Sequence, residues 1–150
     1  MKQSAGILMY RFEQGELRVL LVHPGGPFWA RRDAGAWTIP KGEFDREDPL
    51  AAARREFLEE VGVEVSGELI ALAPVRQKSG KIVHAWAVEG DLDADAAQCR
   101  TFVEISGRRF PEVDRAAWFS IPEAARRINP AQAAFLAELN EALRKRAQRG

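Results

Sequence analysis

Residues 42–63 read GEFDREDPLAAARREFLEEVGV, and this stretch contains the clearest helix signal in the chain. Asp48 can cap the free amides of a first helical turn, and Pro49 stands where its missing N–H costs nothing. Gly62 follows the last turn, in the manner of a helix-terminating glycine. The pattern therefore predicts a helix over residues 48–61. The residues that recur on its apolar face are Leu50, Arg54, Phe57 and Val61, with Ala53 and Leu58 beside them.

Three carboxylates share another face of this helix. Glu56, Glu59 and Glu60 stand at positions i, i+3 and i+4. Like charges at this spacing destabilise a helix by about 0.2–0.5 kcal/mol per pair, and Arg55 only partly shares their face. A hard divalent cation such as Mg²⁺ would offset the repulsion better, because it prefers carboxylate oxygen. Taken alone, however, three such glutamates more often form a solvent-exposed acidic face.

The sequence around the glutamates changes that balance. Residues 37–43 read WTIPKGE before the helix, and residues 55–63 read REFLEEVGV at its end. This stretch resembles the Nudix box, whose pattern is G-x5-E-x7-R-E-U-x-E-E-x-G-U with a bulky aliphatic residue at U. Glu47 precedes Arg55 with the seven residues 48–54 between them, as the pattern requires.

Two positions depart from the pattern. Only the four residues 43–46 separate Gly42 from Glu47, where the pattern has five, and Phe57 occupies an aliphatic position. The shorter spacing falls in a loop, where changes in length are tolerated, and it leaves the helical glutamates in register. Phe57 belongs to the apolar face, so we expect it to affect packing more than chemistry.

The resemblance extends beyond the box and implies a fold. The opening hairpin and residues 117–119 also fit the family, and residues 4–8 with residues 23–27 look like a bacterial branch of predicted nucleotide pyrophosphohydrolases. The implied fold is the Nudix α/β/α sandwich with a mixed central sheet, formed by a single domain over residues 1–150. Alternation and turn residues predict strands at 5–12, 17–23, 63–75, 82–88, 101–106 and 116–119, with helices at 122–128 and 130–146. Residues 37–40 read as a short extended piece, and residues 91–97 as a loop.

The resemblance also implies a magnesium-dependent site, in which Mn²⁺ can replace Mg²⁺. The implied metal ligands are Glu56, Glu59, Glu60 and the backbone carbonyl of Gly42. Glu59 and Arg55 are expected to be catalytic, and Glu47 is expected to pair with Arg55 and so orient the ligands. Lys41 is expected to meet a substrate phosphate.

Family members often recruit a further acidic residue from outside the box, as a metal ligand or a base. Glu104 is placed in the catalytic set on this ground, Glu112 is its equal as a candidate, and Glu43 is a weaker one. All three lie on or near strands or loops of the expected sheet. Each of these residue types is more often a plain surface carboxylate, so the pattern alone does not choose between them.

Substrate contacts are the least defined part of the site. Trp29 and Arg31 are expected to bind substrate, the first by stacking on a base and the second by pairing with a phosphate. Phe28 is an aromatic alternative to Trp29 in the same Gly- and Pro-rich loop. Arg31 and Lys81 are more often solvated charges, and His84 is more often a hydrogen-bonded, partly buried side chain.

Composition limits the classes of partner. Lys and Arg total 22 and Asp and Glu total 22, so there is no global attraction to a long nucleic acid or to an anionic membrane. Cys99 is the single cysteine, which excludes an intrachain disulfide and favours a reducing compartment. No signal core and no apolar run of about 20 residues is present, so we expect a cytoplasmic protein. It is expected to be a monomer or a homodimer that acts on a small-molecule nucleotide.

The expected reaction is Mg²⁺-dependent hydrolysis of a diphosphate linkage in a nucleoside triphosphate or a dinucleoside polyphosphate. A nucleoside diphosphate sugar and a capped RNA end are alternatives within the same class of enzyme. An alternative from another class is a catalytically silent Nudix-fold module that binds nucleotide or protein. Loss of helical glutamates would indicate such a module, and all three glutamates are present.

Overall fold

A computed structural model describes residues 2–149, and its centre is a mixed β-sheet. The strands of this sheet are β1 (Gln3–Glu13), β2 (Glu16–Pro24), β3 (Lys41–Phe44), β4 (Leu69–Arg76), β5 (Ile82–Glu89) and β8 (Val113–Ser120). Their order is β4-β5-β1-β2-β8, with β3 paired to the first part of β1. The pairing of β1 with β5 is parallel and the other pairings are antiparallel, which confirms the predicted mixed sheet.

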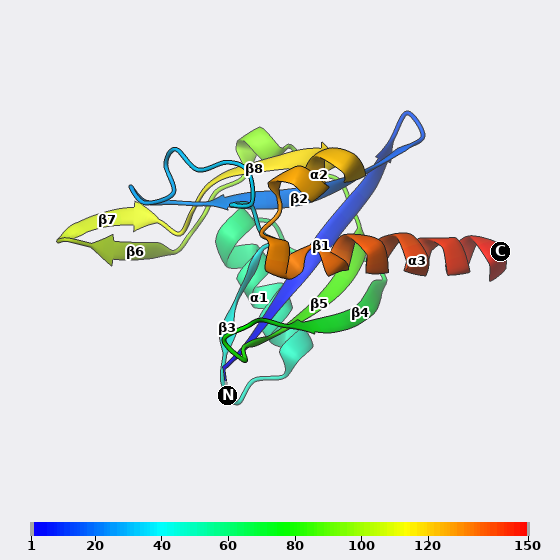
Figure 1. Ribbon diagram of the computed structural model, residues 1–150, viewed down its shortest axis with the longest axis horizontal. Helices are drawn as coiled ribbons and strands as arrows, with labels where there is room; N and C mark the ends of the chain where they lie inside the picture. The colour runs from blue at the N-terminus through cyan, green and yellow to red at the C-terminus, as the bar shows by residue number, and fades with distance from the viewer. Residues whose placement is uncertain (1, 150) are drawn as a thin grey trace.

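Helices cover both faces of this sheet, as Figure 1 shows. The helix α1 (Pro49–Val61) packs on one face, against β1 and β5. The helices α2 (Ile121–Arg127) and α3 (Ala134–Arg149) pack on the other, against β2, β8 and β4. The arrangement confirms the predicted α/β/α sandwich. No helix within residues 2–149 has the length and hydropathy needed to cross a membrane.

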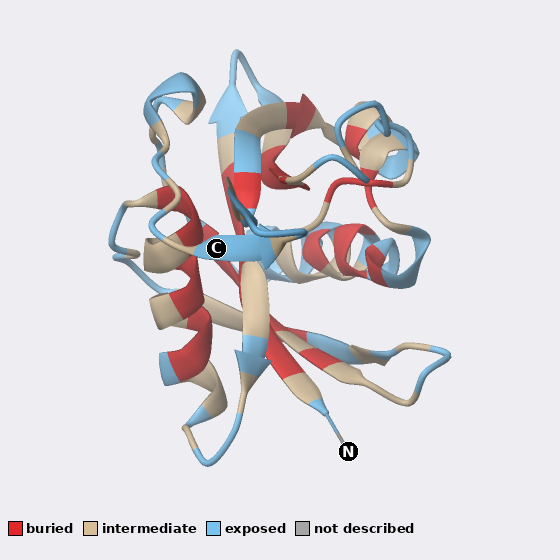
Figure 2. Cartoon of the chain, turned by 90° about the vertical axis from the view of Figure 1, so that its left-hand side faces the viewer, coloured by how far each residue is buried: buried red, intermediate tan, exposed pale blue. Residues whose placement is uncertain are grey.

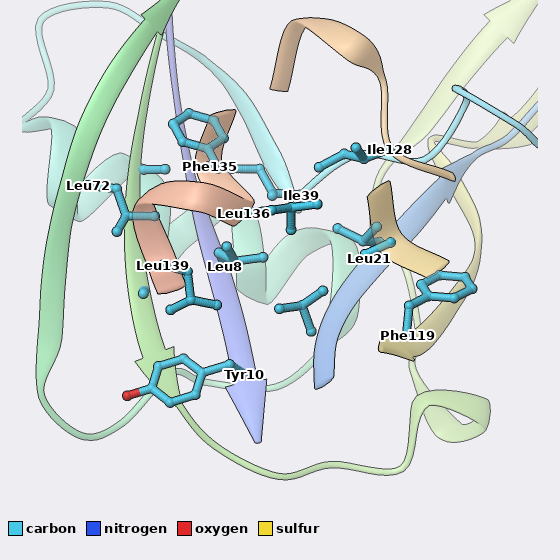
Figure 3. Packing of buried hydrophobic residues seen from close by; sticks show 14 of the residues in the cluster. Leu8, Tyr10, Leu21, Ile39, Leu72, Phe119, Ile128, Phe135, Leu136 and Leu139 are labelled. Carbon is cyan, nitrogen blue, oxygen red and sulfur yellow. The ribbon is translucent and has the colours of Figure 1, made fainter. Parts of the chain in front are cut away.

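The core lies in two layers because the side chains of a strand alternate between the two faces of a sheet. Leu8 of β1 points toward α3 and packs with Phe135 and Leu139, which Figure 3 shows at close range. Ile7, the next residue of β1, belongs instead to the layer under α1, with Phe57. Figure 2 shows the buried positions of the helices turned inward toward the sheet.

The opening hairpin follows the predicted division closely. Gln14 and Gly15 connect β1 to β2 with φ values of 53° and 80°. Two successive positive φ values give the type I′ turn, whose twist matches that of the flanking strands. Both strands extend further than the expected 5–12 and 17–23, because the pairing continues to Glu13 and Glu16 beside the turn.

Several expected strands have different bounds in the structure. Residues 63–68 form no strand, since Gly62 and Gly67 have φ values of 85° and 103° that break extended backbone, and β4 begins only at Leu69. Residues 37–40 carry isolated bridges, and regular pairing starts with β3. The strand expected at 116–119 is longer and begins at Val113.

A two-stranded hairpin stands apart from the main sheet, and the sequence predicted only the first of its two strands. It consists of β6 (Phe102–Ile105) and β7 (Arg108–Pro111), and Figure 1 shows it projecting from the body. Ser106 and Gly107 turn between them with φ values of 51° and 77°. The second strand, RRFP, has too many charges to show an alternating apolar pattern. The loop expected at 91–97 contains the short 3₁₀ turn η1 (Ala94–Ala96).

The helices agree with the sequence in position but differ in detail. Asp48 caps α1 by accepting a hydrogen bond from the Ala51 amide at 3.0 Å, as predicted. The helix expected at 130–146 divides into the 3₁₀ turn η2 (Pro130–Gln132) and α3. The predicted apolar face of α1 is wrong at Leu50 and Arg54, which are half-buried. The buried positions are Ala52, Ala53, Glu56, Phe57, Glu60 and Val61.

Candidate active site

A cleft of about 560 Å³ lies at the end of the sheet where α1, β3, the loop after β2 and the start of β8 meet. The residues that line it are Val22, Pro24, Trp29, Ala36, Thr38, Lys41, Gly42, Glu43, Glu56, Glu59, Glu60, Lys81, Glu112, Val113 and Asn129. The three helical glutamates and Lys41 therefore face one space. Seven of these fifteen residues are charged, which suits a polar, charged ligand better than an apolar one.

The burial of α1 fixes where its glutamates stand. Ala53 and Phe57 are fully buried against the sheet, and Glu56 and Glu60 flank them on the same side of the helix. These two glutamates are only 8% and 7% exposed, so their carboxylates reach the cleft from the edge of the core. The amide of Lys41 on β3 donates to Glu60 Oε1 at 3.2 Å. That contact joins the strand before the helix to the helix itself.

Burial makes the charged forms of these carboxylates costly. The pKa of Glu60 is raised to about 8, first by loss of solvent and then by the charge of Glu56. The pKa of Glu56 is also raised, by burial and by the charge of Glu59. A site that places unsatisfied negative charge side by side favours a bound cation.

Arg55 supplies part of the missing positive charge. Its guanidinium donates to both carboxylate oxygens of Glu47, at 2.8 and 3.0 Å, which is the ion pair expected from the sequence. It also donates to Glu56 at 2.9 Å and to Glu59 at 3.3 Å. The pKa of Arg55 is raised, first by its hydrogen bonds to Glu47. One arginine thus holds two of the cleft glutamates in a defined orientation, which is more than its sequence position indicated.

Gly42 forms the floor beside these carboxylates. A Cβ atom at this position would lie 2.1 Å from Cδ of Glu56 and within 2.3 Å of both its oxygens. Only glycine lets the backbone approach the carboxylate so closely. The oxygens of the Gly42 backbone and of the glutamates are hard donors, and this donor chemistry fits Mg²⁺ or Mn²⁺. Within residues 2–149 no group of three or more His, Cys, Asp or Glu side chains is arranged so that it could hold a metal ion as it stands.

Two lysines provide positive charge opposite the glutamates. The pKa of Lys41 is lowered, first by burial and then by the charge of Lys81. Lys81 reaches the cleft from the β4–β5 turn, and its Nζ lies 3.1 Å from Oε2 of Glu43. The hydrogen bond from Lys81 lowers the pKa of Glu43. The sequence favoured a solvated charge for Lys81, since nothing local shows that this turn comes to the cleft.

The structure separates the candidates outside the box. Glu112, the residue just before β8, lines the cleft. Glu104 lies on the projecting hairpin, exposed and opposite Arg109, and it does not line the cleft. The expectation that placed Glu104 in the catalytic set therefore lacks structural support, because β6 and β7 leave the body of the sheet. Arg31 is likewise exposed and is not among the lining residues.

The structure also shows which of the aromatic and histidine candidates line the cleft. Trp29 lines the cleft, whereas its neighbour Phe28 is 61% exposed and does not. His84 is hydrogen bonded to Oε1 of Gln3 at 2.6 Å, in agreement with its expected structural role. Asn129 lines the cleft and was not anticipated. Its only local signal is that of a cap, since its side chain accepts from the amide two residues later.

The raised pKa of Glu60 predicts how metal-free stability depends on pH. A group with a pKa raised from 4.5 to about 8 contributes stability that is complete below pH 4.5 and lost as pH rises through 8. We expect the free energy of unfolding in EDTA to fall by a few kcal/mol, about 3, between pH 5 and pH 9. Urea titrations at several pH values measure this change.

The matched variant is Glu60→Gln, which removes the titrating group. It should flatten most of the pH dependence and be more stable than the unsubstituted protein at pH 9 in EDTA. The pKa of Glu56 is raised in the same direction, so a smaller slope should remain. Added Mg²⁺ should stabilise the unsubstituted protein more as pH rises, because ligand carboxylates must be ionised. An identical pH slope in the variant would show that Glu60 is not the group responsible.

Comparisons with known proteins agree with this fold. A family model described as NUDIX domain matches residues 1–139. The solved NUDIX domain of Shewanella oneidensis NrtR, complexed with ADP ribose, has a TM-score of 0.69 at 17% identity, covering 94% of this chain and 87% of its own. A C. elegans Ap4A hydrolase binary complex has a TM-score of 0.67 at 22% identity, with 97% and 99% covered. The E. coli ORF135 protein has a TM-score of 0.57 at 28% identity, with 96% and 92% covered. No curated protein matches the chain.

Proposed function

The chain belongs to the Nudix family, and we propose that it hydrolyses a diphosphate linkage in a nucleoside triphosphate or a dinucleoside polyphosphate. The observation that carries this proposal is the charge arrangement of one cleft. Glu56, Glu59 and Glu60 stand together with Lys41 and Lys81 around about 560 Å³. Carboxylates for a divalent cation and ammonium groups for phosphate are the two requirements of a polyphosphate site.

Nudix hydrolases generally use divalent metals, and we propose Mg²⁺ for this chain, with Mn²⁺ as a substitute. The residues that would hold it are Glu56, Glu59, Glu60 and the carbonyl of Gly42. Bound metal would polarise the phosphoryl group and offset the charge that develops during hydrolysis. Arg55, itself held by Glu47, keeps Glu56 and Glu59 oriented through its hydrogen bonds. We propose Arg55 as a positioning residue rather than a group that touches substrate.

The remaining roles follow from what else lines the cleft. Glu112 replaces Glu104 as the proposed acceptor of the proton from the attacking water, because Glu112 lines the cleft and Glu104 does not. Lys41 and Lys81 are proposed to bind the phosphates. Trp29 is proposed to stack on the nucleoside base, since this residue lines the same space.

Phosphate release from a nucleotide panel tests the proposal. The panel contains nucleoside triphosphates, Ap4A, ADP ribose and a nucleoside diphosphate sugar, each with Mg²⁺, with Mn²⁺ or with EDTA. Ap4A and ADP ribose are included because they appear with the related structures named above. We expect turnover that requires a divalent metal, and product identification shows which linkage is cleaved.

The panel also decides between the enzyme and a silent module. Nucleotide binding with no turnover on any substrate, in either metal, would overturn the hydrolase and favour a binding module. Turnover that persists in EDTA would overturn the metal site. The balanced charge of the chain disfavours long nucleic acids as substrates. A single domain over residues 1–150, a monomer or homodimer, and a cytoplasmic location stay predictions.

A further inference from the structure

His23 is fully buried, and the reaction proposed above does not use it. It is the penultimate residue of β2, two residues before the loop over residues 25–36. Its Nε2 lies 2.6 Å from the carbonyl oxygen of Arg32, and its Nδ1 lies 2.9 Å from Oδ1 of Asp114. Both partners are acceptors. The carbonyl can only accept, so Nε2 carries a proton and donates to it.

One of these hydrogen bonds leads directly to the cleft. The amide of Arg32, whose carbonyl contacts His23, donates to the carbonyl oxygen of Trp29 at 2.9 Å. The amide of Trp29 donates in turn to the carbonyl oxygen of Gly26 at 3.3 Å. Two hydrogen bonds therefore connect the buried imidazole, through Arg32, to Trp29, which lines the cleft.

The other hydrogen bond anchors the ring to the sheet. Asp114 lies on β8, and the amide of Gly25 donates to the carbonyl oxygen of Glu112, the residue just before β8, at 2.9 Å. A Cβ atom at Gly25 would lie 2.0 Å from the carbonyl oxygen of Pro111, so the start of the loop is in direct contact with the end of β7. The start of the loop is thus held in place at Gly25, and the hydrogen bond of His23 holds the loop at a second point, Arg32.

Within residues 2–149, the hydrogen bonds of the His23 ring are those to Arg32 and Asp114, and the groups around it are bonded to other residues. Arg115 approaches the same Asp114 oxygen at 3.7 Å. The ring of Trp37 packs edge-on against the imidazole, 5.2 Å between centroids, and its indole N–H donates to Asp33. Asp33 is itself paired with Arg127. These neighbours hold the imidazole in one orientation, in which Nε2 points at the loop.

We propose that His23 is a positioning residue that sets the place of Trp29 in the cleft through the Arg32 carbonyl, and so governs binding of the nucleoside part of the substrate. This inference rests on the proposed hydrolase activity. Trp29 would contact the substrate equally before and during reaction, so its displacement raises KM and leaves kcat unchanged. A purely structural histidine would change the folded fraction and not the ratio of these constants.

Two carboxamide variants test the two hydrogen bonds of the ring one at a time. His23→Asn keeps a donor near the Nδ1 position, facing Asp114, and loses the donor to Arg32. His23→Gln keeps a donor near the Nε2 position and loses the donor to Asp114. We expect His23→Asn to raise KM about tenfold with kcat within about twofold, which is the effect of one unmet buried carbonyl. His23→Gln should restore most of the lost affinity.

The same substitution in a second background tests the path through Trp29. In Trp29→Ala the KM is already raised, and adding His23→Asn should change it by less than about twofold, because coupled residues are not additive. A tenfold effect that persists without the indole would overturn the proposal. Equal KM values for His23→Asn and His23→Gln would also overturn it.

Hydrogen exchange of the substrate-free protein tests the role of His23 without requiring any hydrolase activity. The amides of Trp29 and Arg32 should exchange faster in His23→Asn than in His23→Gln, with the sheet amides unchanged in both. If the unsubstituted protein showed no turnover, the proposed function would fail while this comparison still decides the role of His23. Unchanged exchange in the loop of His23→Asn would overturn the positioning role itself.

Discussion

Glu59→Gln is expected to lower Mg²⁺-dependent turnover by about 100- to 1,000-fold, the range seen when one preorganised charged contact is lost from an active site. The substitution keeps the shape of the side chain and removes its charge. Glu59 is the most exposed of the three helical glutamates, with a side chain that is 32% exposed, so its loss should cost little stability. Measurement of kcat at saturating substrate over a range of Mg²⁺ concentrations gives the effect.

The control is Glu64→Gln, which makes the same change of charge just beyond the helix. Glu64 is exposed and does not line the cleft, so its kcat should stay within about twofold. Melting temperature with and without Mg²⁺ provides a second readout, because a ligand that binds the folded state stabilises it. The Mg²⁺-induced rise should shrink in Glu59→Gln and remain in Glu64→Gln. Full turnover in Glu59→Gln at the same Mg²⁺ concentration would remove Glu59 from the metal site.

Phe57→Ala is expected to destabilise the protein by about 3–5 kcal/mol. Phe57 is fully buried between α1 and the sheet, where it packs in one layer with Ile7 and Val61. Truncation leaves a cavity that the surrounding strands cannot close, since β1 is paired on both sides. Urea unfolding followed by circular dichroism measures the change in the free energy of unfolding.

Phe57→Leu restores the aliphatic residue of the family pattern and should cost less than about 1.5 kcal/mol. The surface control is Phe12→Ala, because Phe12 is 52% exposed and should change stability by less than about 0.5 kcal/mol. We expect leucine at position 57 to keep α1 in place, and the carboxylates of Glu56 and Glu60 then stay in the cleft. Turnover per folded molecule should therefore be preserved in Phe57→Leu. A stable Phe57→Ala protein that had lost turnover would instead assign Phe57 a role in the chemistry.

The helix that carries the site was readable from the sequence because its signals are local. Asp48 caps it and Gly62 ends it, with a φ of 85°. Each signal acts within about four residues of its target, so no distant contact is needed. The spacing of Glu56, Glu59 and Glu60 then follows from helical geometry alone.

Which face of that helix is buried was decided by tertiary packing. The sequence placed Phe57 and Val61 on the apolar face, and both are buried. It also placed Leu50 and Arg54 there, which are only half-buried, and it did not anticipate the burial of Glu56 and Glu60. The spacing of apolar residues cannot predict the burial of a glutamate, because a buried carboxylate is costly unless it has hydrogen-bond partners. Those partners come from other parts of the chain. The Lys41 amide, on the paired strand β3, provides one such contact.

The wall opposite the helix was likewise settled only by long-range pairing. Glu104 and Glu112 were equal candidates in sequence, and the departure of the β6–β7 hairpin leaves only Glu112 at the cleft. His23 and Asp114 are 91 residues apart and meet because β2 pairs with β8. The sequence by itself thus determined the family, the helix and the register of its glutamates, since these depend on short-range backbone geometry. Tertiary structure alone decided what faces them, because strand pairing brings together side chains that carry no local signal of one another.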